Sequence, residues 1–95
     1  MASPEIALTS SVRIAPDVIY RDLEDEAVLL DLKTGTYFGL DPMGTRMWHL
    51  LEENGSLQLV AQRITEQYDV TADVCERDLR EFVERLREKG LVELV

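Results

Sequence analysis

The segment from Leu29 to Leu51, LLDLKTGTYFGLDPMGTRMWHLL, constrains the fold more strongly than any other part of the chain. Its first apolar residues end at the tripeptide KTG (33–35), whose glycine can take the left-handed backbone conformation of a hairpin turn. The residues TYFGL (36–40) then return as an antiparallel strand. Asp41 is a favourable helix N-cap, and Pro42 suits the first helical position, where a missing N–H costs nothing. The segment therefore predicts two antiparallel strands followed at once by a helix.

A further strand is predicted before this segment. The residues DVIYRDLE (17–24) place apolar side chains on both faces at strand spacing. The acidic residues EDE (24–26), which begin at the last residue of this strand, make a turn. The next strand, AVLLDL (27–32), is apolar on both faces, which suits a central position. The three strands form a meander, in which two strands are edges. No later segment is clearly able to cover the last strand (36–40).

Three helical patterns follow the strands, and each is introduced by a capping residue: Asp41, Ser56 and Thr71. Gly90 ends the third pattern, and Leu91 is placed to fold back on the helix in a Schellman motif. Apolar residues recur at helical spacing, so each helix has one buried face. The predicted core positions are Met43, Met47, Leu50 and Leu51 in the first helix, Leu57, Val60, Ala61, Ile64 and Tyr68 in the second, and Cys75, Leu79, Phe82, Val83 and Leu86 in the third.

The order of these elements predicts an α+β fold: a three-stranded antiparallel β-meander followed by three α-helices, similar to a winged helix-turn-helix. A chain of 95 residues forms one domain with a single modest core. Residues 1–17 are interpreted as an N-terminal arm, with enough apolar residues for one short strand, and residues 18–95 as the folded domain. The last residues, LVELV (91–95), are either a short tail or an additional strand.

The net charge of −9, from 19 acidic against 10 basic residues, disfavours two classes of partner. Proteins bind nucleic acids and anionic membranes through lysine and arginine, so we expect neither to be a partner of this chain. The apolar runs are far shorter than the about 20 residues of a transmembrane helix, and the N-terminal residues lack the pattern of a secretion signal. The single Cys75 cannot form an internal disulfide, so we expect a cytoplasmic protein.

The residue types that catalysis needs are scarce. His49 and Cys75 are the single histidine and the single cysteine, too few for a tetrahedral zinc site. Cys75 lies on the apolar side of the third helix, where packing is a more common role for a thiol than nucleophilic attack. Trp48 is interpreted as a core residue between helix and sheet. We therefore expect no metal, no other cofactor and no enzymatic activity; a Cys–His nucleophile pair would require Cys75 and His49 to meet.

A winged-helix DNA-binding regulator is an alternative function, because the second and third helices resemble a helix-turn-helix. A recognition helix inserts its N-terminal residues into the major groove. In this chain that end carries Asp73, Glu76 and Asp78, with Arg77 as its one basic residue. The predicted shape is compatible with DNA binding, but the charges oppose it.

Three stretches in this order resemble the PqqD-like family: the segment 29–51, ITEQYDV (64–70) and DLREFVERLREKGLVEL (78–94). Members have a strand ending in Tyr-Phe-x-Leu, an Asn or Asp followed by a helix-start glycine, an aromatic-containing helix, a Tyr-Asp-Val and a closing Leu-x-x-x-Gly-Leu. Met47 replaces the usual apolar residue before the tryptophan, which is a conservative departure. The resemblance covers residues 18–95 and implies nothing for the arm.

The resemblance implies a RiPP recognition element, a small module that binds the leader segment of a ribosomally synthesised precursor peptide and presents it to a modifying enzyme. In this family the leader adds as an antiparallel strand to the third strand and lies in a cleft against the third helix. The implied partners are the precursor peptide and either the leader peptidase and cyclase of a lasso-peptide pathway or a radical SAM enzyme. The pathway stays open, as does a homodimer formed through the open edge.

The open edge predicted from the residues agrees with this mode of binding, because unpaired N–H and C=O groups can be satisfied by an extended peptide. Gly39 has no side chain and allows close approach. Apolar leader side chains are expected beside Phe82 and either Tyr37 or Phe38, and polar side chains of the third helix are expected to set the register. The predicted peptide-binding residues are Thr36, Tyr37, Phe38, Gly39, Leu40, Val74, Asp78, Glu81, Phe82 and Arg85.

Overall fold

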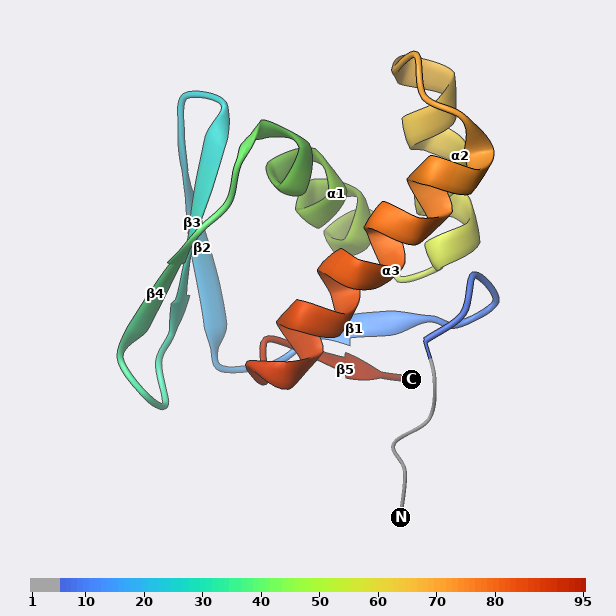
Figure 1. Ribbon diagram of the computed structural model, residues 1–95. Helices are drawn as coiled ribbons and strands as arrows, with labels where there is room; N and C mark the ends of the chain where they lie inside the picture. The colour runs from blue at the N-terminus through green and yellow to red at the C-terminus, as the bar shows by residue number, and fades with distance from the viewer. Residues whose placement is uncertain (1–5) are drawn as a thin grey trace.

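The computed structural model describes residues 6–95, which form two small sheets and three helices (Figure 1). The predicted meander followed by three helices is confirmed, and the fold is α+β. None of the helices in the described range is long and apolar enough to cross a membrane. In chain order the elements are β1 (Val12–Ile14), β2 (Val18–Leu23), β3 (Glu26–Asp31), β4 (Thr36–Gly39), α1 (Pro42–Glu53), α2 (Leu57–Gln67), α3 (Ala72–Glu88) and β5 (Val92–Leu94).

The three-stranded sheet has the order β2-β3-β4, and both pairs are antiparallel. In its register Leu29 of β3 lies between Tyr20 of β2 and Phe38 of β4. Gly35 in the β3–β4 turn has a φ of 72°, the left-handed conformation predicted from the KTG sequence. Within the described residues β4 pairs with β3 alone, so one of its two edges has no strand beside it.

Each helix begins at its predicted cap, and α3 ends at the predicted glycine. The side chains of Asp41, Ser56 and Thr71 each accept a hydrogen bond from the backbone N–H three residues further on. At the end of α3, Gly90 has a φ of 76°, and the N–H of Leu91 donates to the carbonyl of Leu86 over 2.9 Å. This last bond is the Schellman arrangement expected from the sequence.

The core lies between the helices and one face of the sheet. Trp48 is fully buried at its centre, as predicted. The predicted apolar faces of the helices are buried with two exceptions: Met43 is half-buried, and Tyr68 is 40 % exposed. Tyr68 departs from the prediction because α2 ends at Gln67, and the extended backbone of the following residue leaves the helical stripe.

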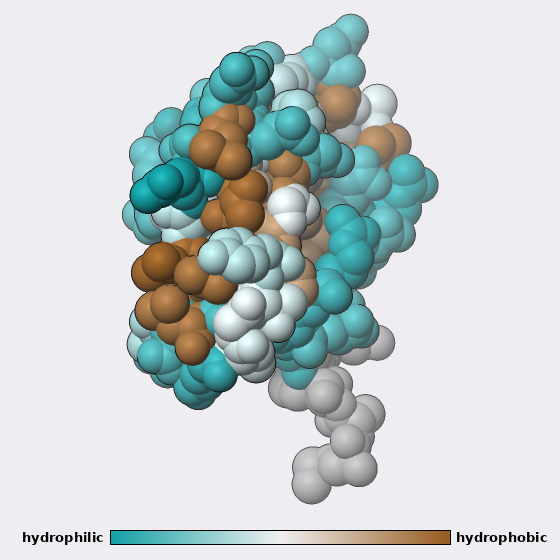
Figure 2. Space-filling model, turned by 90° about the vertical axis from the view of Figure 1, so that its left-hand side faces the viewer, coloured by the Kyte–Doolittle hydropathy of each residue, from teal (hydrophilic) through white to brown (hydrophobic). Residues whose placement is uncertain are grey.

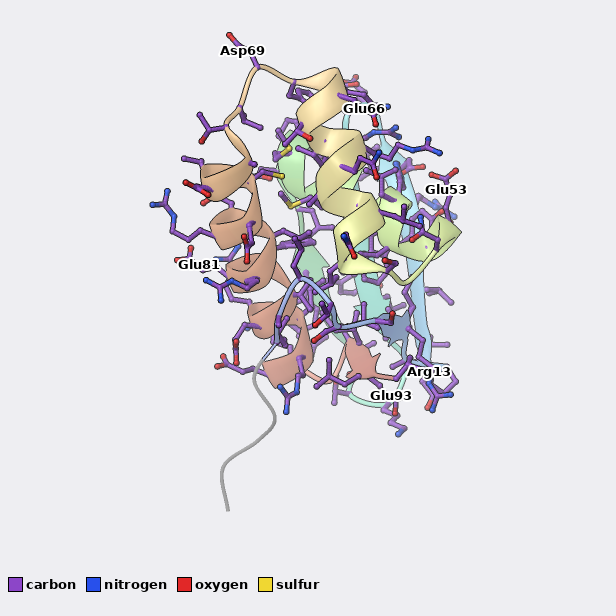
Figure 3. The ribbon with its side chains drawn as sticks, turned by 90° about the vertical axis from the view of Figure 1, so that its right-hand side faces the viewer. Arg13, Glu53, Glu66, Asp69, Glu81 and Glu93 are labelled. Atoms are coloured by element: carbon purple, nitrogen blue, oxygen red, sulfur yellow. The ribbon has the colours of Figure 1, made fainter. Side chains whose placement is uncertain are left out.

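The two ends of the chain pair with each other instead of with the meander. β1 and β5 form an antiparallel pair in which Val12 lies opposite Leu94. Figure 3 shows Arg13 of β1 and Glu93 of β5 side by side, and their side chains form an ion pair at 3.0 Å. The C-terminal residues are therefore a strand, but one that leaves β4 uncovered.

Part of the predicted arm belongs to the same core. Ile6 and Val12 are both buried and join the cluster that contains Trp48. Gly55, between α1 and α2, permits this contact: the Val12 N–H donates to its carbonyl over 2.9 Å, and a Cβ there would overlap the Val12 carbonyl oxygen. Residues 1–5 of the arm lie outside the described residues. The boundary between residues 17 and 18 stays a prediction.

The two faces of the meander differ in what covers them. Ala27, Leu29 and Asp31 of β3 face the helices and are buried, whereas Val28 and Leu30 face the other way and are half-buried. An apolar outer face results, seen as the brown area in Figure 2. The exposed apolar side chains of the meander include Ile19, Leu23, Leu32 and Tyr37.

A buried hydrogen bond fixes the sheet against α1. The Oγ1 of Thr45 accepts the backbone N–H of Ala27 over 2.8 Å, and Thr45 is buried. The carbonyl of Ala27 in turn accepts the N–H of Leu40 over 2.9 Å. The start of β3, the end of β4 and α1 are therefore joined at one point, which sets how β4 lies relative to the helices.

We expect Thr45→Val to destabilise the fold by about 1–3 kcal/mol, because it leaves the buried Ala27 N–H without an acceptor. Thr65→Val is a matched control, since the Thr65 hydroxyl bonds only to carbonyls of its own helix; its effect should stay within about 0.5 kcal/mol. Urea unfolding followed by Trp48 fluorescence measures both variants. Equal stability of the two variants would contradict this role for Thr45.

Candidate functional site

The open edge of β4 offers backbone groups to a further strand. The N–H of Leu40 donates to Ala27, so Leu40 and, by the alternation of an antiparallel ladder, Phe38 direct their backbone groups toward β3. Tyr37 and Gly39 alternate with them and direct their N–H and C=O groups to the open side. No strand within residues 6–95 lies on that side. The edge therefore presents two residues whose donors and acceptors are spaced to pair with an extended chain.

A cavity of about 200 Å³ lies between β4 and the C-terminal half of α3. Phe38 and Leu40 line it from the sheet side, and Phe82 and Leu86 line it from the helix. Leu91, the residue after the Schellman turn, also lines it. The residues that line the cavity are thus mostly apolar, and the cavity adjoins the unpaired strand edge; its charged lining residues are Asp41, Arg85 and Lys89.

A second cavity, of about 320 Å³, adjoins the first toward the N-terminus of α3. Asp41, Gly44, Phe82 and Arg85 line both cavities. The two cavities therefore form one continuous depression beside β4, termed here the β4–α3 cleft. The remaining residues of the second cavity are Met43 and Met47 from α1 and Asp78 and Glu81 from α3.

Local sequence signals position the walls of this cleft. A Cβ at Gly44 would lie 3.3 Å from the Phe82 ring and 3.0 Å from the Asp41 carboxylate, so a glycine here lets α3 approach the first turn of α1. The same carboxylate oxygen accepts the Gly44 N–H over 2.7 Å and starts α1. At the other end, Gly90 turns the chain so that the fully buried Leu91 returns to the cleft.

Most of the predicted site residues lie along the cleft, and three lie elsewhere. Thr36 sits at the hairpin, where its hydroxyl contacts Thr34. Tyr37 points to the outer face of the sheet with 69 % of its surface exposed, so Phe38 is the aromatic residue that lines the cleft. Val74 lies in the first turn of α3, before the cleft begins. The others line the cleft: Phe38, Gly39, Leu40, Phe82 and Arg85 in the first cavity, and Asp78 and Glu81 in the second, with Phe82 and Arg85 shared.

Several cleft residues were not among those predicted. Lys89 could have been found, because it follows Phe82 by seven residues and Arg85 by four, and so continues the same helical face. Met43 and Met47 were predicted only as core residues; their place in the cleft depends on how α1 and α3 pack, which has no local signal. The remaining cleft residues that were not among the predicted peptide-binding residues are Asp41, Gly44, Leu86 and Leu91.

The two residues that a Cys–His nucleophile pair would require both interact with other groups. The Cys75 thiol is buried and donates to the carbonyl of Ala61 at a sulfur–oxygen distance of 3.7 Å. Burial raises the pKa of this thiol, and the charge of Asp78 raises it further, so the thiol stays protonated at neutral pH. The Nε2 of His49 lies 2.8 Å from a carboxylate oxygen of Asp22. Cys75 and His49 therefore do not form a nucleophile–base pair.

The opposite edge of the meander is attached to the end of α1. The Tyr20 hydroxyl donates to Glu52 over 2.7 Å, and this bond is the main reason that the pKa of Tyr20 rises to about 12. The Tyr20 ring meets Trp48 edge to face at a centroid distance of 6.0 Å. Because β2 is tied to α1 through its side chains, the sheet is held at that side while β4 keeps its open edge.

Fold and cleft together define a class of protein: a small α+β module whose unpaired strand edge adjoins a cleft with a mainly apolar cavity. The family model described as Coenzyme PQQ synthesis protein D (PqqD) matches residues 26–92. The match spans more than half of the chain, and the chain belongs to the PqqD family.

Two solved structures resemble this one. The first, TbiB1 in complex with the TbiA(beta) leader peptide, is 44 % identical in sequence with a TM-score of 0.83; the match covers 85 % of this chain and 94 % of that chain. The second, lasso peptide synthetase B1 complexed with the leader peptide, is 26 % identical with a TM-score of 0.73 and covers 87 % and 98 % of the two chains. No curated protein matches this sequence.

In the free protein we expect the amides of Tyr37 and Gly39 to exchange hydrogen at least about tenfold faster than those of Phe38 and Leu40, because only the latter two donate to β3. Hydrogen exchange of the ¹⁵N-labelled protein followed by NMR measures all four amides in one experiment. Uniform protection along the strand would contradict the open edge.

Proposed function

We propose that this chain binds the leader segment of a ribosomally synthesised precursor peptide, which joins the meander as an additional strand on β4. The observation that carries the proposal is the position of the mainly apolar cavity at Phe38 and Phe82, directly beside the unpaired edge at Tyr37 and Gly39. Membership of the PqqD family supports the proposal, as do the leader peptides in the two similar structures. The edge provides affinity for an extended backbone, and the cleft selects side chains.

The leader runs antiparallel to β4. In this orientation a peptide residue opposite Tyr37 and another opposite Gly39 can each exchange both of their backbone hydrogen bonds with the strand. Gly39 has no atoms near the position of a Cβ, so a second backbone can approach it closely. The side chains of the added strand alternate between the cleft and the outer face.

An apolar leader side chain is the main anchor. Directed toward α3, it enters the cavity between Phe38 and Phe82, where burial of a leucine-sized side chain contributes about 1.5–3 kcal/mol. The cleft therefore distinguishes a leader from an arbitrary extended peptide, because the backbone bonds alone are independent of sequence.

The bound leader is presented to a modifying enzyme, and the chain itself performs no catalysis. A lasso-peptide pathway is favoured over a radical SAM pathway, because one of the similar structures is a lasso peptide synthetase B1 with its leader. The expected partner enzymes are then a leader peptidase and a cyclase. The cytoplasm is the proposed location, consistent with the single free Cys75.

A synthetic peptide with the leader sequence of the precursor encoded beside this chain is expected to bind with micromolar or tighter affinity. Binding should slow hydrogen exchange at Tyr37 and Gly39 and shift the resonances of α3. Isothermal titration calorimetry gives the affinity, NMR gives the site, and a scrambled peptide is the control. No binding of the leader, or binding of duplex DNA that weakens steeply with salt, would contradict the proposal.

The two neighbouring aromatic residues of β4 give a second prediction. Phe38→Ala should weaken leader binding by about tenfold or more, because it removes one wall of the cleft. Tyr37→Ala should change the affinity by no more than about twofold, because that side chain lies on the outer face and the backbone is kept. Both affinities are measured by calorimetry after circular dichroism has shown that the variants are folded. A larger loss for Tyr37→Ala would place the leader on the opposite face of the sheet.

A further inference from the structure

Charged side chains line the β4–α3 cleft in an order: of those that line one cavity only, the cation lies at one end and the carboxylates lie at the other. Lys89 borders only the cavity next to Phe38, whereas Asp41 and Arg85 border both cavities. Asp78 and Glu81 border the adjoining cavity, toward the N-terminus of α3. An order of this kind can select the sequence of the peptide that the cleft receives, and its significance therefore rests on the proposed function.

The cationic end is free to receive an acidic side chain. The Nζ of Lys89 lies over the Phe38 ring, 5.1 Å from its centroid, which places the ammonium group at the rim of the apolar cavity. Within residues 6–95, neither Lys89 nor Arg85 has a carboxylate within ion-pair distance. A carboxylate of a bound peptide would therefore replace water at these cations without breaking an existing ion pair.

At the acidic end, Glu81 is the carboxylate that makes the fewest interactions with other residues. Asp41 is occupied as the N-cap of α1, and Asp78 makes an exposed ion pair with Arg77 at 3.6 Å. Glu81 has no ion pair within the described range, and Figure 3 shows it projecting from the side of α3 away from α2. Met43 is in the same cavity and can pack against the aliphatic stem of a lysine or arginine.

The spacing of these groups matches that of side chains on an added strand. The eight steps along the helix from Glu81 to Lys89 cover about 12 Å, and four steps along a strand cover about 13 Å. Alternate side chains of a strand point to one face, so residues i, i+2 and i+4 of the peptide face the cleft together. Residue i+2 of the peptide then lies at the Phe38–Phe82 cavity, between the positions of residues i and i+4 at the two charged ends of the cleft.

The direction of the order follows from the packing of α3 against β4. Lys89, at the C-terminal end of α3, lies over Phe38, while Phe82, two turns earlier, lies beside Gly44, which comes after β4 in the chain. The two elements therefore run in opposite directions along the cleft. A leader antiparallel to β4 has its N-terminal part at Glu81 and its C-terminal part at Lys89.

We infer that the cleft selects leaders in which a basic, an apolar and an acidic residue occupy positions i, i+2 and i+4, in that order from the N-terminus. The basic residue pairs with Glu81, the apolar residue enters the cavity between Phe38 and Phe82, and the acidic residue pairs with Lys89 and Arg85. Net charge alone does not give this order, because a protein of charge −9 attracts any basic peptide at long range.

The test uses two variants of the synthetic leader with identical composition and net charge. One carries Lys-x-Leu-x-Asp in the segment that contacts β4, and the other carries Asp-x-Leu-x-Lys. We expect the first to bind about tenfold more tightly in fluorescence anisotropy at low salt, because reversal replaces an attraction by a repulsion at both ends. The preference should shrink at about 1 M salt, where the Debye length is about 3 Å.

Variants of the protein in which the charged residues at the two ends of the cleft are exchanged or neutralised test the inference directly. Glu81→Lys combined with Lys89→Glu keeps the net charge and should invert the preference. Glu81→Gln combined with Lys89→Gln should abolish it, which keeps the inference testable should the exchanged protein fail to fold. Glu66→Lys is the matched control: Figure 3 shows Glu66 on α2, it lines no part of the cleft, and its substitution should leave the preference unchanged.

Equal affinity of the two peptides, a preference for Asp-x-Leu-x-Lys, or a preference that survives the double glutamine variant would overturn the inference. Any of these results, obtained with a protein that still binds the unmodified leader, leaves leader binding itself intact. Failure of the unmodified leader to bind would overturn the proposed function instead, so the two failures are distinguishable.

Discussion

The arrangement depends on the backbone of β4 being paired on one side only. An open strand edge exposes donors and acceptors and invites association, so proteins usually keep such edges short or cover them. Here the edge is four residues long, and the C-terminal strand β5 pairs with β1 instead of with β4. The edge is thereby left available to a chain from outside.

The edge is useful for recognition because hydrogen bonds attach the meander to α1 and so keep β4 in place. Thr45 and Leu40 both bond to Ala27, so α1 and the end of β4 share one anchor on β3. Tyr20 attaches the far strand to α1 through Glu52. A strand that is already ordered loses little conformational entropy when a peptide pairs with it, so more of the interaction energy appears as affinity. The Schellman turn at Gly90 adds to this order, because it closes the cleft with Leu91.

Most of the fold could be predicted from the sequence, because its signals are local. Capping by Asp41, the left-handed Gly35 and the apolar stripe of α3 each depend on neighbours within a few residues. The pairing of β1 with β5 could not be predicted, because the two strands come from opposite ends of the chain and are only three residues each. The apolar character of both faces of β3 identified a central strand but could not say which face meets the helices.

The candidate site was predictable along β4 and the middle of α3, and less so elsewhere. Strand alternation required Tyr37 and Phe38 to point in opposite directions, but only the packed structure shows that Phe38 is the one beside α3. Met43, Met47 and Gly44 enter the cleft because α1 crosses near α3, a tertiary contact that leaves no pattern in the sequence. Lys89 did leave a pattern, as the next position of the helical face that carries Phe82 and Arg85.

Scalar couplings across hydrogen bonds test the central claim most directly. With ¹⁵N-labelled protein and a ¹³C-carbonyl-labelled leader peptide, NMR detects couplings only between a donor nitrogen and the carbonyl that accepts its proton. Strand addition predicts couplings from the nitrogens of Tyr37 and Gly39 to peptide carbonyls two residues apart. A bound leader that shows no coupling to either nitrogen would contradict the account.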